Sequence, residues 1–160
     1  MSPQAFIQGE FQRRLDERYR VAIPQELLQT LSPDGADCIL AKERPGCLSL
    51  WNAQVWRPKL EDGVALVQSK MQAGKLEGRI SQVQLLGRLL STRHKTIQLG
   101  ARGRLLIPEG FREFLQVEPG GDVLVVGAAV CVEIWSPQVW VRYLESRMPR
   151  FRRLLDKLSG

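Results

Sequence analysis

The chain has 160 residues, 44% of them hydrophobic, which is enough for one domain or for two small intertwined halves around a real core. Its formal net charge of +6 favours an anionic partner, either nucleic acid or an acidic membrane surface. No hydrophobic signal region follows Met1 and no apolar run approaches the roughly 20 residues of a membrane span, so we expect a cytoplasmic protein.

The first third of the chain alternates strand-forming and turn-forming stretches. After Pro24, which suits the first position of a helix, Leu27, Leu28 and Leu31 recur at helical spacing. The predicted order is strand, turn, strand, short helix, strand, turn, strand, over residues 11–15, 16–20, 21–23, 24–31, 38–41, 43–46 and 47–51.

The next stretch is predicted to be helical. Apolar spacing indicates helices over residues 61–71 and 77–90, separated at Gly74. Asn52 and Ser136 are both good N-cap residues, and the second of them precedes a helix over residues 137–147. We expect Met148 and Pro149 to break that helix, leaving a separate basic amphipathic segment over 151–158.

A ten-residue stretch occurs twice, as Leu15 to Pro24 and Leu99 to Pro108. Each copy has an apolar residue, a polar turn with two arginines one residue apart, a strand-forming triplet and a proline. The copies are 84 positions apart, and the same offset pairs Leu31 with Leu115, Leu40 with Leu124, Cys47 with Cys131, Trp51 with Trp135, Gln54 with Gln138, Val55 with Val139 and Trp56 with Trp140. We therefore predict an internal duplication over residues 11–56 and 95–140, with a helical insert at 57–94 and a basic helical tail at 141–160.

This pattern predicts an α+β, mainly β fold. Strand pairs this short cannot bury their apolar faces alone, so we expect four strands from each half to close into one small barrel or sandwich with the helices outside. Cys38, Cys47 and Cys131 are odd in number and include no C-x-x-C pair, which indicates a reduced protein. Because His94 is the single histidine, we expect no metal site, and we expect no cofactor.

Positive charge gathers at both repeated turns. Asp16 and Arg20 are four residues apart, close enough for the carboxylate to hold the guanidinium in place. The planar fork of arginine matches phosphate and guanine acceptors, and two matching turns would face one anionic surface together. The candidate DNA-binding residues are Arg13, Arg14, Arg18, Arg20, Arg102 and Arg104, with Asp16 orienting Arg20 and with His94 and Lys95 near the second turn.

Each of these features also has a purely structural interpretation. The arginines could be solvated residues at hairpin ends, although their recurrence at a fixed offset favours a functional role. The four tryptophans suit packing inside or between subunits better than base stacking. The basic tail could be a solvated helix face, a supplementary phosphate contact or an anionic-membrane contact.

The repeated motif resembles the MraZ family, within the AbrB-like swapped-hairpin superfamily. The resemblance rests on the turn from Asp16 to Arg20, the apolar strand ending in Ile23-Pro24, the tryptophan-containing helix that follows, and the second copy. It implies a double-split β-barrel built from two AbrB-like repeats and a ring-shaped homo-oligomer. It also implies regulation of the bacterial division and cell-wall gene cluster through short direct repeats in double-stranded DNA.

The resemblance assigns DNA contact to Arg20 and Arg104 and an orienting role to Asp16. The second aspartate of the family pattern is replaced by Gly100, so we expect Arg104 to be more mobile and to contact phosphate less selectively. We also expect the glycines at 100 and 103 to permit turn geometries that the first copy cannot adopt.

We thus predict a nucleoid-associated, non-enzymatic transcriptional regulator, acting as a repressor, without a small-molecule substrate. Three alternatives stay open. They are an AbrB-like nucleoid-coating or antitoxin-type protein, an interaction scaffold that binds no nucleic acid, and a nuclease using Asp16, Glu17, Glu61 or Asp62. The nuclease is disfavoured because these carboxylates lie in different elements without a nucleophile–base pair.

Overall fold

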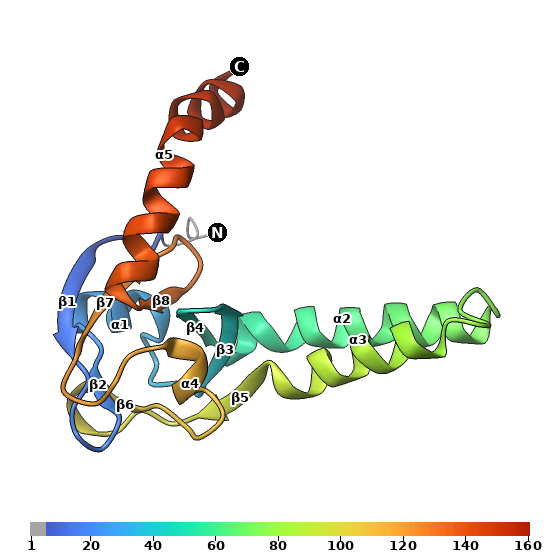
Figure 1. Cartoon of the computed structure of the whole chain (residues 1–160), viewed down its shortest axis with the longest axis horizontal. Coiled ribbons are helices and arrows are strands. Elements are labelled where there is room, and N and C mark those ends of the chain that lie inside the picture. The colour runs from blue at the N-terminus through green and yellow to red at the C-terminus, as the bar shows by residue number, and fades with distance from the viewer. Residues whose placement is uncertain (1–5) are drawn as a thin grey trace.

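A computed structural model describes residues 6–160, which form an α+β protein with a β-sheet body and two long helical projections (Figure 1). The strands are β1 (Glu10–Arg14), β2 (Arg20–Ala22), β3 (Cys38–Arg44), β4 (Cys47–Asn52), β5 (His94–Ile97), β6 (Arg104–Leu106), β7 (Asp122–Gly127) and β8 (Val132–Trp135). The helices are α1 (Gln25–Leu31), α2 (Ala53–Gln72), α3 (Ile80–Thr92), the 3-10 turn η1 (Ala101–Gly103), α4 (Arg112–Leu115) and α5 (Pro137–Ser159).

Six strands form one antiparallel sheet in the order β1-β7-β8-β4-β3-β5, and β2 and β6 pair with each other in a separate two-stranded ribbon. The two halves of the chain exchange strands, because β1 pairs with β7 and β5 pairs with β3. Neither half could keep these hydrogen bonds without the other.

The strand pairing stops short of the expected barrel. Among residues 6–160, β1 and β5 remain edge strands, so the sheet is not closed. The ribbon strands β2 and β6 have three residues each and extend neither edge. The fold is therefore α+β with a mainly antiparallel sheet, and a double-split barrel is not confirmed.

The core lies between the sheet, the ribbon and the short helices. Leu15, Val21, Ile23, Leu27 and Leu105 belong to one buried apolar cluster that both halves supply. The central strands β3 and β4 are buried over several consecutive residues rather than in alternation, as expected for strands covered on both faces.

The cysteines are free and buried. Cys47 and Cys131, which the 84-residue offset pairs, both lie in the interior. Burial raises the pKa of the Cys131 thiol to about 12 and raises the pKa of Cys47 as well, so both side chains act as small apolar groups.

The tryptophans pack in two matched pairs inside one chain. The ring centroids of Trp51 and Trp56 are 5.5 Å apart, and those of Trp135 and Trp140 are 5.0 Å apart, both tilted. The Trp51 indole N–H donates to Ser49 Oγ at 2.9 Å, and the Trp135 N–H donates to Glu133 Oε1 at 3.0 Å. These contacts agree with the packing interpretation of the tryptophans.

The helical hairpin of α2 and α3 projects from the sheet body (Figure 1). As predicted, the Asn52 side chain caps α2 by accepting from the Gln54 N–H at 2.9 Å. Helix α2 starts at Ala53, well before the predicted 61, so the expected boundary at 56/57 falls inside it.

For α5 the expected N-cap position is confirmed, and the expected break at Pro149 was wrong. Ser136 is the N-cap residue, with Pro137 following it, but the serine side chain makes no capping hydrogen bond. The helix continues through Pro149 to Ser159 instead of breaking. A proline removes one backbone hydrogen bond, and the strong helix formers on both sides of Pro149 sustain the helix despite this loss.

Candidate functional site

The two repeated motifs meet in the β2–β6 ribbon. Val21 lies opposite Leu105 and both are buried, so the alternation of side chains along a strand puts Arg20 and Arg104 on the outer face. Arg20 pairs with Leu106, and Ala22 pairs with Arg104. The two arginines are therefore diagonal neighbours on one face, with Cα atoms about 7–8 Å apart in a regular ladder.

Asp16 organises the first turn. Its Oδ1 accepts from the backbone N–H groups of Arg18 at 2.8 Å and Arg20 at 2.9 Å, while its Oδ2 accepts from Arg20 Nε at 2.9 Å. The predicted contact between Asp16 and Arg20 is thus present. The N–H of Arg20, together with the other donors, holds the pKa of the Asp16 carboxyl below its usual value, so the group is ionised at neutral pH.

The second turn repeats the backbone bonds but has no carboxylate. The Asp16 N–H donates to the Arg20 carbonyl at 3.0 Å, and the Gly100 N–H donates to the Arg104 carbonyl at 2.8 Å. Within residues 6–160 the ion pairs include Arg20 with Asp16 and none to Arg104. The replacement of the second aspartate therefore leaves the Arg104 guanidinium without the anchor that Arg20 has.

The two turns differ in backbone geometry, though not for the expected reason. Gly100 has an ordinary extended conformation, and Gly103 has φ 71, close to the φ 61 of its repeat mate Tyr19. The residue that differs is Arg102, which has φ 60 although it is not a glycine. Arg18, the repeat mate of Arg102, does not have a positive φ. The side chains of these two arginines therefore leave their turns in different directions.

A shallow pocket of about 200 Å³ brings the charged residues together. It is lined by Arg14, Asp16, Arg20 and Arg104, with Val21 and Ala22. Three cations from two separate strand pairs therefore border one hollow around a single carboxylate. This concentration of positive charge suits an anionic ligand that presents phosphate or other acceptor oxygens.

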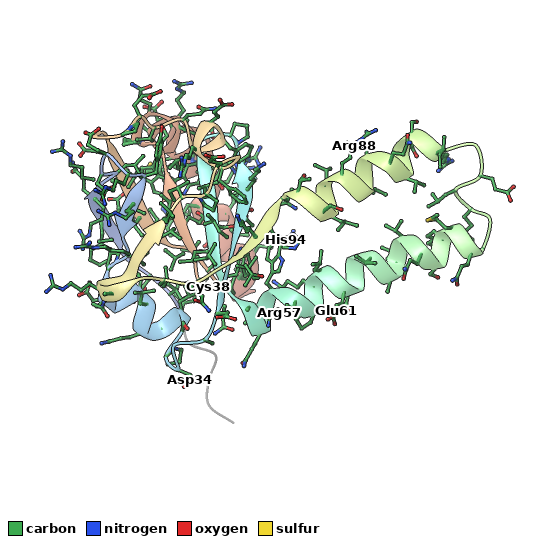
Figure 2. All side chains as sticks on the ribbon, turned by 90° about the horizontal axis from the view of Figure 1, so that it is seen from below. Asp34, Cys38, Arg57, Glu61, Arg88 and His94 are labelled. Carbon is green, nitrogen blue, oxygen red and sulfur yellow. The ribbon has the colours of Figure 1, made fainter. Side chains whose placement is uncertain are left out.

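The other predicted residues lie outside that pocket. Arg13 packs its guanidinium 5.6 Å from the centre of the Phe11 ring, and Arg18 and Arg102 are exposed in the turns. Lys95 of β5 lines a second hollow with Leu106, Glu109 and Arg112, among others, between β5, β6 and the start of α4. His94 instead lies at the foot of the helical hairpin (Figure 2), with its ring 5.9 Å from that of Trp56.

Sequence reasoning missed Arg112. Its Nε donates to the Ile107 carbonyl at 2.8 Å, and its guanidinium lies 4.1 Å from the centre of the Tyr19 ring. It thereby braces the first turn from α4. The repeat gave no signal for it, because its mate at the 84-residue offset is Leu28.

The described residues hold neither a candidate metal centre nor a candidate membrane span. Residues 6–160 include no cluster of three or more His, Cys, Asp or Glu side chains that could hold a metal ion. In the same part of the chain, no helix combines the length and the apolar character needed to cross a membrane.

The fold and the site define an α+β protein in which two arginine-bearing turns are joined through a two-stranded ribbon. Residues 92–156 match the family model described as "MraZ protein, putative antitoxin-like". Curated proteins named "Transcriptional regulator MraZ" align with nearly the whole chain. The protein of Heliobacterium modesticaldum is 27% identical over 150 residues, 94% of each chain, and that of Caldanaerobacter subterraneus is 26% identical over 154 residues, 96% of this chain and 97% of its own. The relative from Treponema denticola is 27% identical over 151 residues, 94% of this chain and 96% of its own. The chain therefore resembles the MraZ family, through residues 92–156 in the family model and through nearly its whole length in these relatives.

Proposed function

We propose that this protein is a sequence-specific DNA-binding transcriptional regulator that represses the division and cell-wall gene cluster, including its own promoter. The observation that carries the proposal is the joining of Arg14, Arg20 and Arg104 around one hollow on the outer face of the ribbon. The net charge of +6 and the printed names of the relatives support it.

The two arginine motifs have different parts in this proposal. Because Asp16 holds the Nε of Arg20, the terminal nitrogens of that side chain are directed outward in a fixed orientation, as bidentate reading of a guanine requires. Arg104 has no such anchor and supplies a less selective phosphate contact. A two-stranded ribbon is narrow enough to approach the major groove.

We also propose that the two halves are AbrB-like repeats that complete a double-split barrel, and that several protomers form a ring. One basic ribbon gives weak, salt-sensitive binding. Protomers spaced to match direct repeats in the DNA raise the affinity through effective concentration. In this proposal the protein acts in the cytoplasm, associated with the nucleoid, and catalyses no reaction.

The proposal is tested by fluorescence-anisotropy titration of DNA from upstream of the protein's own gene and of scrambled DNA, each at two salt concentrations. We expect tighter binding to the upstream DNA that persists at moderate salt. If the protein binds both DNAs equally and salt abolishes this binding, the result would favour a nucleoid-coating protein. Absence of DNA binding at low salt would favour an antitoxin-type or scaffold protein.

The variants Arg20→Ala and Arg88→Ala separate the site from general charge. Both remove one positive charge, but Arg88 is exposed on the projecting helix α3, away from the ribbon (Figure 2). Loss of one base-reading arginine costs about 1–3 kcal/mol, or about 5- to 150-fold in affinity. Arg20→Ala should therefore reduce binding to upstream DNA far more than Arg88→Ala, and equal losses would remove the ribbon from its proposed role.

A further inference from the structure

Helix α5 carries a regular apolar seam that the rest of residues 6–160 leaves largely uncovered. Its apolar residues alternate three and four positions apart, which is the a and d pattern of a coiled coil. The seam consists of Val141, Leu144, Met148, Phe151, Leu155 and Leu158. Met148 and Phe151 are each 65% exposed, and Leu158 is 77% exposed.

The seam is separate from the side of α5 that packs on the sheet body. The helix is anchored at its first turns, where the rings of Trp140 and Tyr143 lie 5.0 Å and 4.9 Å from that of Trp135. Beyond these turns it projects away from the body (Figure 1). Its apolar seam is therefore accessible to another helix along most of its length.

We propose that α5 pairs with α5 of a second copy of this chain as an antiparallel coiled coil. In the antiparallel register centred between Pro149 and Arg150, every seam residue has an apolar partner. Val141 meets Leu158 of the other copy, Leu144 meets Leu155, and Met148 meets Phe151. No seam residue is left unpaired, and the two sheet bodies lie at opposite ends of the helix pair.

The flanking charges select this orientation. In the antiparallel register Glu145, beside the seam, lies next to Arg152 of the other copy, and the two-fold symmetry makes this pair twice. In a parallel pair, Arg147 would instead lie next to Arg152 of the other copy, which is repulsive. Charge complementarity therefore favours a second, antiparallel copy.

An acidic membrane surface would attract the six basic residues of α5 but would leave its two acidic residues without a partner. Glu145 and Asp156 flank the seam on the same side, where an acidic lipid surface would repel them. In a pair of α5 helices, Glu145 instead lies next to an arginine of the other copy. Such a contact is isologous, so it joins protomers two by two, whereas ring closure needs a heterologous contact. It does not depend on DNA binding.

The test is sedimentation of the full-length protein over a range of concentrations. Phe151→Glu places charge on the seam at an exposed position, so it leaves the fold intact and should weaken pairing about tenfold or more. The matched control is Ile80→Glu, which is 67% exposed on the helical hairpin and should leave the pairing unchanged. The proposal would be overturned if Phe151→Glu had the same sedimentation mass as the wild type. It would also be overturned if Ile80→Glu changed that mass equally.

Charge exchange tests the orientation. Glu145→Arg alone and Arg152→Glu alone each bring like charges together and should weaken pairing, whereas the double variant restores opposite charges and should recover it. If the double variant does not recover pairing, the antiparallel register is wrong. Co-sedimentation of the wild-type protein with phosphatidylserine vesicles, lost in Phe151→Glu without a change in mass, would assign the seam to a membrane surface instead.

Discussion

Val21 and Leu105 lie directly opposite each other in the β2–β6 ribbon, although they are 84 positions apart in the chain and occupy the same place in the two repeated motifs. Ser49 and Glu133, also 84 positions apart, face each other in the same way between β4 and β8. In both places, equivalent strands of the two halves pair antiparallel about residues that are equivalent in the repeat. This symmetry explains why the two motif arginines reach the same outer face.

Leu105→Ala should destabilise the protein because Leu105 is fully buried beneath the ribbon. Truncating a buried leucine leaves a cavity and costs about 2–5 kcal/mol of the free energy of unfolding. The control is Leu106→Ala, on the same strand but 52% exposed, which should cost no more than about 0.5 kcal/mol. Urea denaturation measures both variants, and equal losses would show that the ribbon does not cover the core.

Gly100→Asp should give Arg104 the anchor that Arg20 has. A Cβ at Gly100 would come no closer than 3.6 Å to the Arg104 carbonyl oxygen, so the side chain fits. If the arginines read DNA, the affinity for upstream DNA should rise about three- to tenfold, as expected for one charge-assisted hydrogen bond that orients a reading side chain.

The control for that variant is Gly87→Asp, which adds the same charge on α3 where a Cβ meets nothing within 4 Å. It should leave the preference for upstream over scrambled DNA unchanged. If Gly100→Asp weakens binding to both DNAs as the control does, the carboxylate does not orient Arg104.

Gly103→Ala should disrupt the second turn. The new Cβ would lie 2.5 Å from Leu28 Cδ1 and 2.9 Å from the Ile23 carbonyl oxygen, at a backbone φ of +71. Gly78→Ala has nearly the same φ, +75, with nothing within 4 Å, so it isolates the backbone cost. Gly103→Ala should lower the free energy of unfolding by about 1–3 kcal/mol more than Gly78→Ala does. This difference is the usual cost of overpacking.

Glu133 should make stability fall as pH rises. Burial raises the pKa of its carboxyl, so from about pH 4.5 upward the unfolded chain loses this proton before the folded chain does. Glu133 then opposes folding increasingly until pH exceeds its folded pKa, and its contribution is constant above that. Glu133→Gln retains an oxygen for the Trp135 N–H and removes the charge.

Thermal unfolding at a series of pH values measures this effect. The variant should match the wild type near pH 4 and become progressively more stable than it toward neutral pH. Parallel curves for the two proteins would mean that Glu133 ionises as readily in the folded protein as in the unfolded chain.

The sequence by itself determined the local features of this protein. The strands and turns, the contact between Asp16 and Arg20, the Asn52 cap and the interior place of Cys47 all follow from residues close in the chain or from the repeat. Each depends on short-range hydrogen bonding or on the alternation of apolar residues, so the pattern of residue types suffices to predict it.

Only the tertiary structure decided which distant strands pair. The exchange of β1 and β5 between the halves, the meeting of Arg14 with Arg104 and the bracing of Tyr19 by Arg112 depend on contacts between residues far apart in sequence. Several pairings would satisfy the same apolar pattern, and the packing of the whole core selects among them. The helix through Pro149 and the φ of Arg102 likewise run against local preference, and here too the surrounding structure outweighs it.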